Sequence, residues 1–318
     1  MSDPFGRLRR LVFGIGPSET QFAKRGFWLG NDDHRRHLEK AGSTFALGYN
    51  AALEENRPDH LASRLDEVEL QWRGFAYEGA AMALALLDVL TPWKRNRWQT
   101  FLNGPGARHT YMVHVGVGWA LGRLRRPLEK YLPRWDRLLK WLVVDGCGFH
   151  EGFFHPQRYF ARQETPRRLS GYARRVFDQG LGRSLWFVEC ADASRIATAV
   201  NRFAPIRHRD LWGGVGLACT YAGGVSRDVI ESLAVSSGPC RADLAQGAAF
   251  AAKARQRAGN PTEHTDMACR VLCRMSANEA SDLTDWGLID LPLDGSEPGF
   301  EVWRQRVRAR CESDASRV

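Results

Sequence analysis

The chain has no uncharged apolar run long enough to cross a membrane. Its most apolar stretch, GFAYEGAAMALALLDVL, is interrupted by Glu78 and Asp88, whereas a membrane-spanning helix needs about 20 consecutive apolar residues. The N-terminal apolar patch that follows Arg9 and Arg10 is too short for a secretory signal, and no cleavage site follows it. We therefore expect a cytoplasmic protein that associates with a membrane only through a partner.

Cysteines that would build a disulfide framework or a zinc site are also lacking. The seven cysteines are an odd number and are scattered from Cys147 to Cys311, a pattern typical of reduced thiols. Cys269 and Cys273 are four residues apart, but no second Cys or His pair has the spacing of zinc ligands. The sequence therefore predicts no metal site.

Motifs that identify common enzymes and their cofactors are absent as well. The sequence contains no P-loop, no dinucleotide-binding fingerprint and no nucleophile elbow. In GFHEGFFH, His150 and His155 are five residues apart, or about 140° around a helix, so this stretch is not the H-E-x-x-H motif of zinc proteases. Any cofactor is therefore unknown from the sequence.

What the chain does have in excess is arginine. Its 45 basic and 36 acidic residues give a net charge of +9, and arginines cluster in ETPRRLSGYARRVF, which includes Arg167, Arg168, Arg174 and Arg175. Such an excess permits phosphates, nucleic acid or an acidic protein as a partner. The repeat described next lacks the variable polar pair that a base-reading array needs, so we do not expect nucleic acid to bind.

A short pattern recurs along the chain. Six segments share it, EGAAMA, VGVGWA, DGCGFH, QGLGRS, GGVGLA and QGAAFA. Their leading glycines are Gly79, Gly116, Gly146, Gly180, Gly214 and Gly247, with separations of 37, 30, 34, 34 and 33 residues. A period of about 34 residues is typical of stacked helical hairpins.

The columns of this pattern have physical meaning. Positions are counted from the leading glycine, which is the second letter of each segment. The third position is then always small, the fourth is large in every segment and the fifth is small in most. Small residues on one face of a helix let a neighbouring helix approach closely. That packing must offset the cost of each glycine, about 1 kcal/mol relative to alanine in a helix.

We therefore predict an all-α fold built as a helical-hairpin repeat array of about six units. A tetratricopeptide-like solenoid is one geometry, and a closed α/α ring around a central pocket is the alternative. Residues 1–60 form an N-terminal extension or cap, residues 61–275 the repeat domain, and residues 276–318 a C-terminal cap and basic tail. RPLEKYLPRWDRLLKWLVV, ADASRIATAVNRF and SRDVIESLAV are expected to be helical, and LIDLPLDG is the sole strand candidate.

Two residues break the pattern. His150 stands where the other segments carry Ala or Ser, and Arg183 stands in a column of Met, Trp, Phe and Leu. Departures from a local rule often mark functional sites, although a hydrogen-bonded core histidine would also fit. The residue before each glycine is often polar, and it would either cap a helix or face a shared pocket. The candidate acids, bases and cation are Glu78, Asp145, His150, Glu151, Asp178 and Arg183.

Aromatic residues near these positions are candidates for holding an apolar substrate. The predicted substrate-binding residues are His114, Trp119, Phe149, Phe153, Phe154, Gln179 and Trp186.

The motifs RGFAYEGAAMALALLD, VGVGWALGRL, DGCGFHEGFFH, FDQGLGRSLWF and LWGGVGLACTYAGG together resemble the UnbL-type bacterial family, a family of unknown function found in enediyne biosynthetic gene clusters. The similarity runs from about Phe13 to Trp303. It implies specialised metabolism beside a polyketide synthase that makes a linear polyene, with UnbV-type proteins and UnbU-type membrane proteins as pathway partners. It supplies no catalytic residues.

The resemblance and the residues together lead to two hypotheses. The first is an enzyme, or a component of an enzyme complex, that converts the polyene or another polyketide-derived molecule towards the enediyne core of an antibiotic. The second is a non-catalytic scaffold whose basic surface docks an acyl carrier domain or the membrane partner. Under the scaffold hypothesis, His150→Ala and Arg183→Ala would leave product formation intact, whereas charge reversal at the arginine cluster would abolish it.

Overall fold

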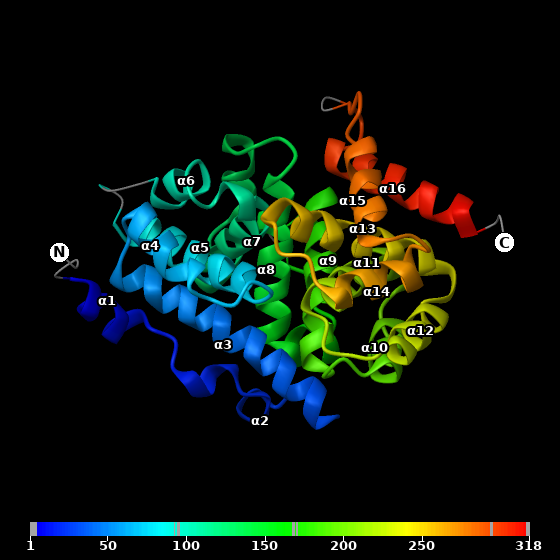
Figure 1. Ribbon diagram of the computed structural model, residues 1–318, viewed down its shortest axis with the longest axis horizontal. Helices are drawn as coiled ribbons and strands as arrows, with labels where there is room; N and C mark the ends of the chain where they lie inside the picture. The colour runs from blue at the N-terminus through cyan, green and yellow to red at the C-terminus, as the bar shows by residue number, and fades with distance from the viewer. Residues whose placement is uncertain are drawn as a thin grey trace.

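The computed structural model describes residues 5–91, 93, 96–166, 169, 171–292 and 295–315 (Figure 1). The long inner helices are α3 (Asp32–Glu54), α5 (Arg73–Leu90), α7 (Thr110–Arg123), α8 (Lys140–Phe154), α9 (Gly171–Val188), α11 (Pro205–Ala222) and α13 (Arg241–Ala258). The other α-helices are α1 (Gly6–Phe13), α2 (Phe22–Arg25), α4 (Pro58–Asp66), α6 (Arg97–Leu102), α10 (Ala193–Asn201), α12 (Arg227–Ser236), α14 (Glu263–Leu272), α15 (Ala277–Trp286) and α16 (Gly299–Ala315). Short turns of other helix types are Pro17–Thr20, Ala107–His109, Leu128–Lys130, Leu132–Arg134, Gln157–Ala161 and Gly238–Cys240.

Every regular element in these ranges is a helix, so the all-α prediction is confirmed. The strand candidate LIDLPLDG forms a turn followed by irregular chain over 288–292, and its residues Leu293 and Asp294 lie outside the described ranges. The predicted helix in RPLEKYLPRWDRLLKWLVV begins only at Lys140. Pro127 and Pro133 each lack the N–H donor that a helix interior needs, and this part of the segment forms 3-10 turns instead.

The inner helices form one continuous row. Each packs along the next in the order α3, α5, α7, α8, α9, α11 and α13, and Figure 1 shows this row running from the blue α3 across the green α8. The connecting helices α10, α12 and α14 pack against one another on the outside of the row. The predicted helices ADASRIATAVNRF and SRDVIESLAV are α10 and α12 of this outer layer.

The repeated glycine is what allows neighbouring inner helices to touch. A Cβ atom built on Gly146 would lie 2.1 Å from the carbonyl oxygen of Val115, and one built on Gly214 would lie 1.9 Å from that of Gln179. In both cases the oxygen belongs to the residue just before the glycine of the preceding helix. The helices therefore run parallel and in register, and any side chain at this column would collide with backbone.

The small residue two positions later makes the same contact with the following helix. A Cβ on Gly148 would lie 2.2 Å from the carbonyl oxygen of Phe177. Gly48 of α3 has the same relation to Ala76 of α5, at 1.9 Å. The inner row therefore starts at α3, within the segment that the sequence assigned to an extension, because Ala46 stands where the pattern has its first glycine.

The row curls, so that its late helices return to its early ones. The Tyr221 ring of α11 lies 5.4 Å from the Phe75 ring of α5, measured between centroids. Arg255 of α13 donates a 3.1 Å hydrogen bond to the carbonyl oxygen of Gln71, just before α5. The concave side of the row therefore faces a cavity, which is described below.

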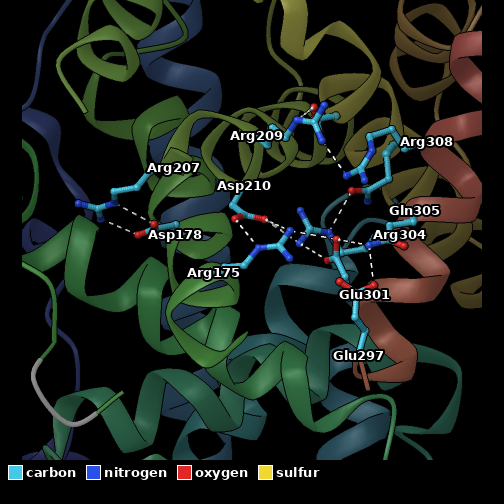
Figure 2. Close-up of polar contacts among 12 residues, drawn as sticks. Arg175, Asp178, Arg207, Arg209, Asp210, Glu297, Glu301, Arg304, Gln305 and Arg308 are labelled. Atoms are coloured by element: carbon cyan, nitrogen blue, oxygen red, sulfur yellow. Dashed lines mark hydrogen bonds and ion pairs between the residues drawn. The ribbon is translucent and has the colours of Figure 1, made fainter. Parts of the chain in front are cut away.

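A buried ion network fastens the C-terminal helix to the end of the row. Arg304 of α16 is fully buried and lies 2.8 Å from Asp210 of α11 and 3.1 Å from Glu301. Arg175 of α9 contacts the same two carboxylates (Figure 2). Because each buried charge has a partner of opposite sign, the network avoids the large penalty of an unpaired buried ion.

Candidate functional site

The curled row encloses a cavity of about 530 Å³, a volume within the usual range for small-molecule sites. Its walls come from α3, α5, α7, α8, α9 and α11, and the segment before α3 covers one side. The large apolar residues that these six helices contribute are Phe45, Phe75, Trp119, Phe149, Phe153, Phe154, Phe187, Leu217 and Tyr221. These positions include the large column of the repeat, so the same pattern that packs the helices also builds the pocket.

Glu78 of α5 is the buried carboxylate of the cavity. It is 3% exposed and accepts a 3.1 Å hydrogen bond from the indole N–H of Trp119. Burial raises the pKa of Glu78 to about 7, with a further small contribution from Asp145, while Arg183 and the Trp119 hydrogen bond oppose the rise. Near neutral pH a large fraction of this group is therefore a carboxylic acid with a proton to give.

Arg183 of α9 is the cation that broke the repeat pattern, and its charge is balanced by a neighbouring carboxylate. Its guanidinium forms an ion pair with Asp145 of α8, and Gln179 donates a 2.8 Å hydrogen bond to the other oxygen of that carboxylate. Burial works against the charge, but Asp145 and Glu78 outweigh it and raise the pKa of Arg183. The guanidinium also lies over the Phe149 ring, 5.0 Å from its centroid, as cations commonly do.

His150 and Glu151 of α8 form a second polar pair in the lining. His150 Nδ1 lies 3.2 Å from Glu151 Oε1, with the imidazole N–H donating to the carboxylate. Burial lowers the pKa of His150 even though Glu151 opposes the shift, so the free ring is neutral at physiological pH. Space for the ring comes from Gly122 of α7, where a Cβ would lie 3.0 Å from Nδ1.

Trp119 lies between the two polar groups. Its N–H is bonded to Glu78, and the edge of its ring meets the His150 ring at 5.8 Å between centroids. Phe45 and Phe149 pack on it at 4.6 and 4.9 Å. An acid and a neutral base are thus held on either side of one aromatic surface.

The structure places the predicted residues in three groups. Glu78, Trp119, Phe149, His150, Glu151, Phe153, Phe154 and Arg183 line the cavity. Asp145 and Gln179 lie behind Arg183, and Asp145 lines a smaller void of about 40 Å³ that α16 covers with Phe300 and Trp303.

The remaining three predicted residues have other partners. Asp178 pairs with Arg207 through contacts of 2.6 and 2.8 Å (Figure 2). His114 Nδ1 lies 2.7 Å from the carbonyl oxygen of Thr110. Trp186 is fully buried and donates to the carbonyl oxygen of Gly223 at 3.1 Å. These contacts stabilise the fold and do not reach the cavity lining.

Several lining residues were missed from the sequence. Phe45 stands in the column before the core position of α3, but alanine at that core position hid the match. Tyr221 lies seven residues after the core glycine of α11, whereas the repeated pattern ends four residues after that glycine. The cavity opening, called the rim below, is lined by Arg25, Arg123 and Arg125. These residues belong to no repeating column, so no periodic signal marked them.

The arginine cluster proposed as a docking surface is partly engaged. Arg175 is bound to Asp210 and Glu301, and Arg174 donates to the carbonyl oxygen of Leu169. Arg167 and Arg168 lie outside the described residues.

The described residues contain no metal-binding group, no membrane-spanning helix and no disulfide. Among them, no three His, Cys, Asp or Glu side chains are grouped to hold a metal ion. Within the same ranges no helix is both long and apolar enough to span a membrane. All seven cysteines are free and buried, and Cys273 donates a 3.2 Å hydrogen bond to the carbonyl oxygen of Ala245.

Comparison with known proteins gives one match. A family model described as "Protein of unknown function (DUF1702)" matches residues 4–311, nearly the whole chain. No curated protein and no solved structure matches it.

Proposed function

We propose that this chain, which belongs to the DUF1702 family, binds an extended conjugated hydrocarbon chain in its aromatic cavity and moves protons along it. One observation carries the proposal. Glu78, with a pKa of about 7, is buried in a cavity to which seven Phe and Trp side chains contribute a large apolar surface. An acid tuned to neutral pH in a largely apolar pocket is the arrangement that general acid catalysis requires.

The lining supports binding of a flat, apolar ligand. Phe149 and Phe153 stack with their planes 17° apart and their centroids 6.0 Å apart, and Trp119 packs against both. Burying conjugated carbon against these faces stabilises the complex by roughly 25 cal/mol for each Å² removed from water. The deep polar groups of the lining are largely bonded to one another, Glu78 to Trp119, Arg183 to Asp145 and His150 to Glu151, so a hydrocarbon need not supply their partners.

The proposed reaction relocates a double bond. Glu78 gives its proton to one end of a conjugated system, and the electron pair of a double bond forms the new C–H bond. The resulting allylic cation faces the Trp119 and Phe149 rings, which stabilise positive charge. Neutral His150 then removes a proton from another carbon, and that C–H electron pair forms the shifted double bond. Electrons balance without an oxidant or reductant.

Asp145 keeps Arg183 from opposing this cation. An unpaired guanidinium beside a carbocation would raise the barrier, whereas the Arg183–Asp145 ion pair has no net charge. The Glu151 carboxylate orients His150 through its hydrogen bond and stabilises the imidazolium that forms. Glu78, His150, Glu151 and Arg183 thus have distinct roles in the proposed reaction.

The resemblance to UnbL-type proteins supports a biological setting. In it, the substrate is a polyene released by an iterative polyketide synthase, and the reaction is a step towards an enediyne core. UnbV-type and UnbU-type proteins, the latter in the membrane, are the expected pathway partners of a cytoplasmic protein. The geometry of the cavity supports a polyene as the substrate class, and the resemblance supplies the pathway.

The proposal is tested by incubating the purified protein with a linear conjugated polyene in D₂O. We expect the absorption maximum to shift and deuterium to appear at a carbon of the polyene. Glu78→Gln should bind the polyene but incorporate no deuterium, and His150→Gln should be slowed by at least about 100-fold, the lower end of the contribution of a general base. Wild-type protein that binds the polyene without deuterium incorporation at any pH from 5 to 8 would refute the chemistry.

A further inference from the structure

The rim of the cavity carries cations that the proposed proton transfer does not use. Arg123, at the end of α7, and Arg125, just after it, line the cavity and are both exposed. Arg25 lines it as well, with its guanidinium 4.4 Å from the centroid of the Phe154 ring. The interior is aromatic, so the opening is strongly positive by comparison.

Among the described residues, two of these cations form no direct ion pair, although Arg123 lies near enough to Glu19 for their charges to interact. Arg25 is paired with Glu19. Arg123 rests on the Tyr49 ring at 5.8 Å, and within the described ranges neither its guanidinium nor that of Arg125 has an ion pair or a hydrogen bond. Two unpaired guanidinium groups at one opening can together hold an anion, because charge-assisted hydrogen bonds are the strong ones.

The backbone holds Arg125 in an unusual conformation. Its φ is +49°, in the left-handed region that residues with a Cβ rarely adopt. Arg125 N–H donates to the carbonyl oxygen of Gly122, at 2.9 Å, and Arg126 N–H donates to that of Leu121. Arg125 in this tight C-terminal turn lines the same cavity as Arg123, and strain of this kind is commonly found at ligand-holding residues.

The deep cation does not compete for the same anion. Arg183 is already neutralised by Asp145 and faces Glu78, so a second anion placed there would meet two carboxyl groups. His150 beside it is bonded to Glu151. An amphipathic ligand is therefore oriented by charge, with its anionic end at the rim and its apolar chain inside.

We propose that the ligand of this cavity is an anionic amphiphile, whose terminal carboxylate or phosphate is held by Arg123 and Arg125 while its conjugated chain fills the aromatic interior. This inference rests on the proposed use of the cavity for an extended apolar chain. It does not depend on proton transfer by Glu78.

The test compares three probes that share one conjugated tetraene chain: the fatty acid, the corresponding alcohol, and the phosphate ester of that alcohol. We expect each anionic probe to bind wild-type protein about tenfold or more tightly than the alcohol, the effect of one or two charge-assisted hydrogen bonds. Arg123→Ala/Arg125→Ala should remove this preference and leave alcohol binding unchanged. The adjacent Arg126→Ala, exposed and outside the lining, is the matched control and should keep it.

The outcomes separate the two proposals. Equal binding of alcohol and acid to wild-type protein would overturn the role of the rim while the cavity remains a hydrocarbon site. Failure of all three probes to bind would overturn the proposed function itself. A phosphate ester that outcompetes the acid would support the rim and favour a phosphate group over a carboxylate as the anionic end of the ligand.

Discussion

Glu78 is a cavity residue whose ionisation depends strongly on the fold. In water a glutamate has a pKa near 4.5 and is almost fully ionised at neutral pH. Here the carboxylate is buried in the cavity, where Trp119 donates a hydrogen bond to it. The protein therefore favours the protonated form. This has a consequence for stability as well as for chemistry, because a proton retained only by the folded state links folding to pH.

The linkage gives a prediction for Glu78→Gln. The pKa of Glu78 is raised from 4.5 to about 7, so the folded state loses stability as pH rises through this window, by roughly 3 kcal/mol in total. Glutamine resembles the protonated acid and does not titrate. Urea unfolding should therefore show the variant close to wild type at pH 4.5 and more stable than wild type at pH 8. A stability difference that stays constant over this range would show that Glu78 titrates as in water.

At the residue scale the sequence predicted the exceptions better than their partners. His150 and Arg183 stood out because they broke columns, and both line the cavity. Their partners could be only partly predicted. Asp145 lay in a polar column, but Gly122, which makes space for the imidazole, is one glycine among 31. Asp178 was selected for its neighbours in sequence, and its pairing with Arg207 depends on where α11 begins.

At the scale of the helices, backbone contact through glycine explains why the inner helices tolerate so poor a helix former. Each glycine costs its helix about 1 kcal/mol relative to alanine, yet it lets two backbones meet along a parallel row. A β-carbon at the contact would force the helices apart and loosen packing on both sides. The penalty of substitution should therefore depend on the column and not on helix propensity.

Two adjacent glycines of α11 test this directly. A Cβ on Gly214 would lie 1.9 Å from the carbonyl oxygen of Gln179, whereas one on Gly213 would lie 3.4 Å from its nearest neighbour, Arg304. We expect Gly214→Ala to lower the free energy of unfolding by at least about 2 kcal/mol. Gly213→Ala should leave it unchanged or raise it by up to about 1 kcal/mol. Equal effects of the two substitutions would contradict backbone contact at Gly214.

Element prediction from the sequence succeeded where the period was intact. The six glycine segments all lie in inner helices, because close packing of each helix against the next requires the same small residues. Helix α3 was missed since it replaces the first glycine by Ala46 but keeps Gly48. The helix expected after Pro127 forms only from Lys140 on, and its first part was wrong because the missing N–H of proline outweighed the apolar pattern there.

At the scale of the whole molecule, curling of the row is what converts packing into a binding site. Residues from six helices reach one cavity, and contacts such as Phe75 with Tyr221 bring the two ends of that set together. Periodicity along the chain predicts a row of helices but carries little information about its curvature. The rim, built in part by the segment before α3, has no repeat at all. The cavity wall was therefore partly predictable and its opening was not.

The most direct test of the account is to fill the cavity and measure binding of the conjugated tetraene fatty acid. Ala218 lines the cavity and is 4% exposed, so Ala218→Leu and Ala218→Phe should weaken binding progressively, the larger side chain by more than tenfold, while thermal unfolding confirms that each variant is folded. Ala309→Phe on the exposed face of α16 is the control and should bind as wild type does. If wild-type protein binds the acid and the folded Ala218→Phe variant binds it equally well, the ligand lies elsewhere and the central claim is wrong.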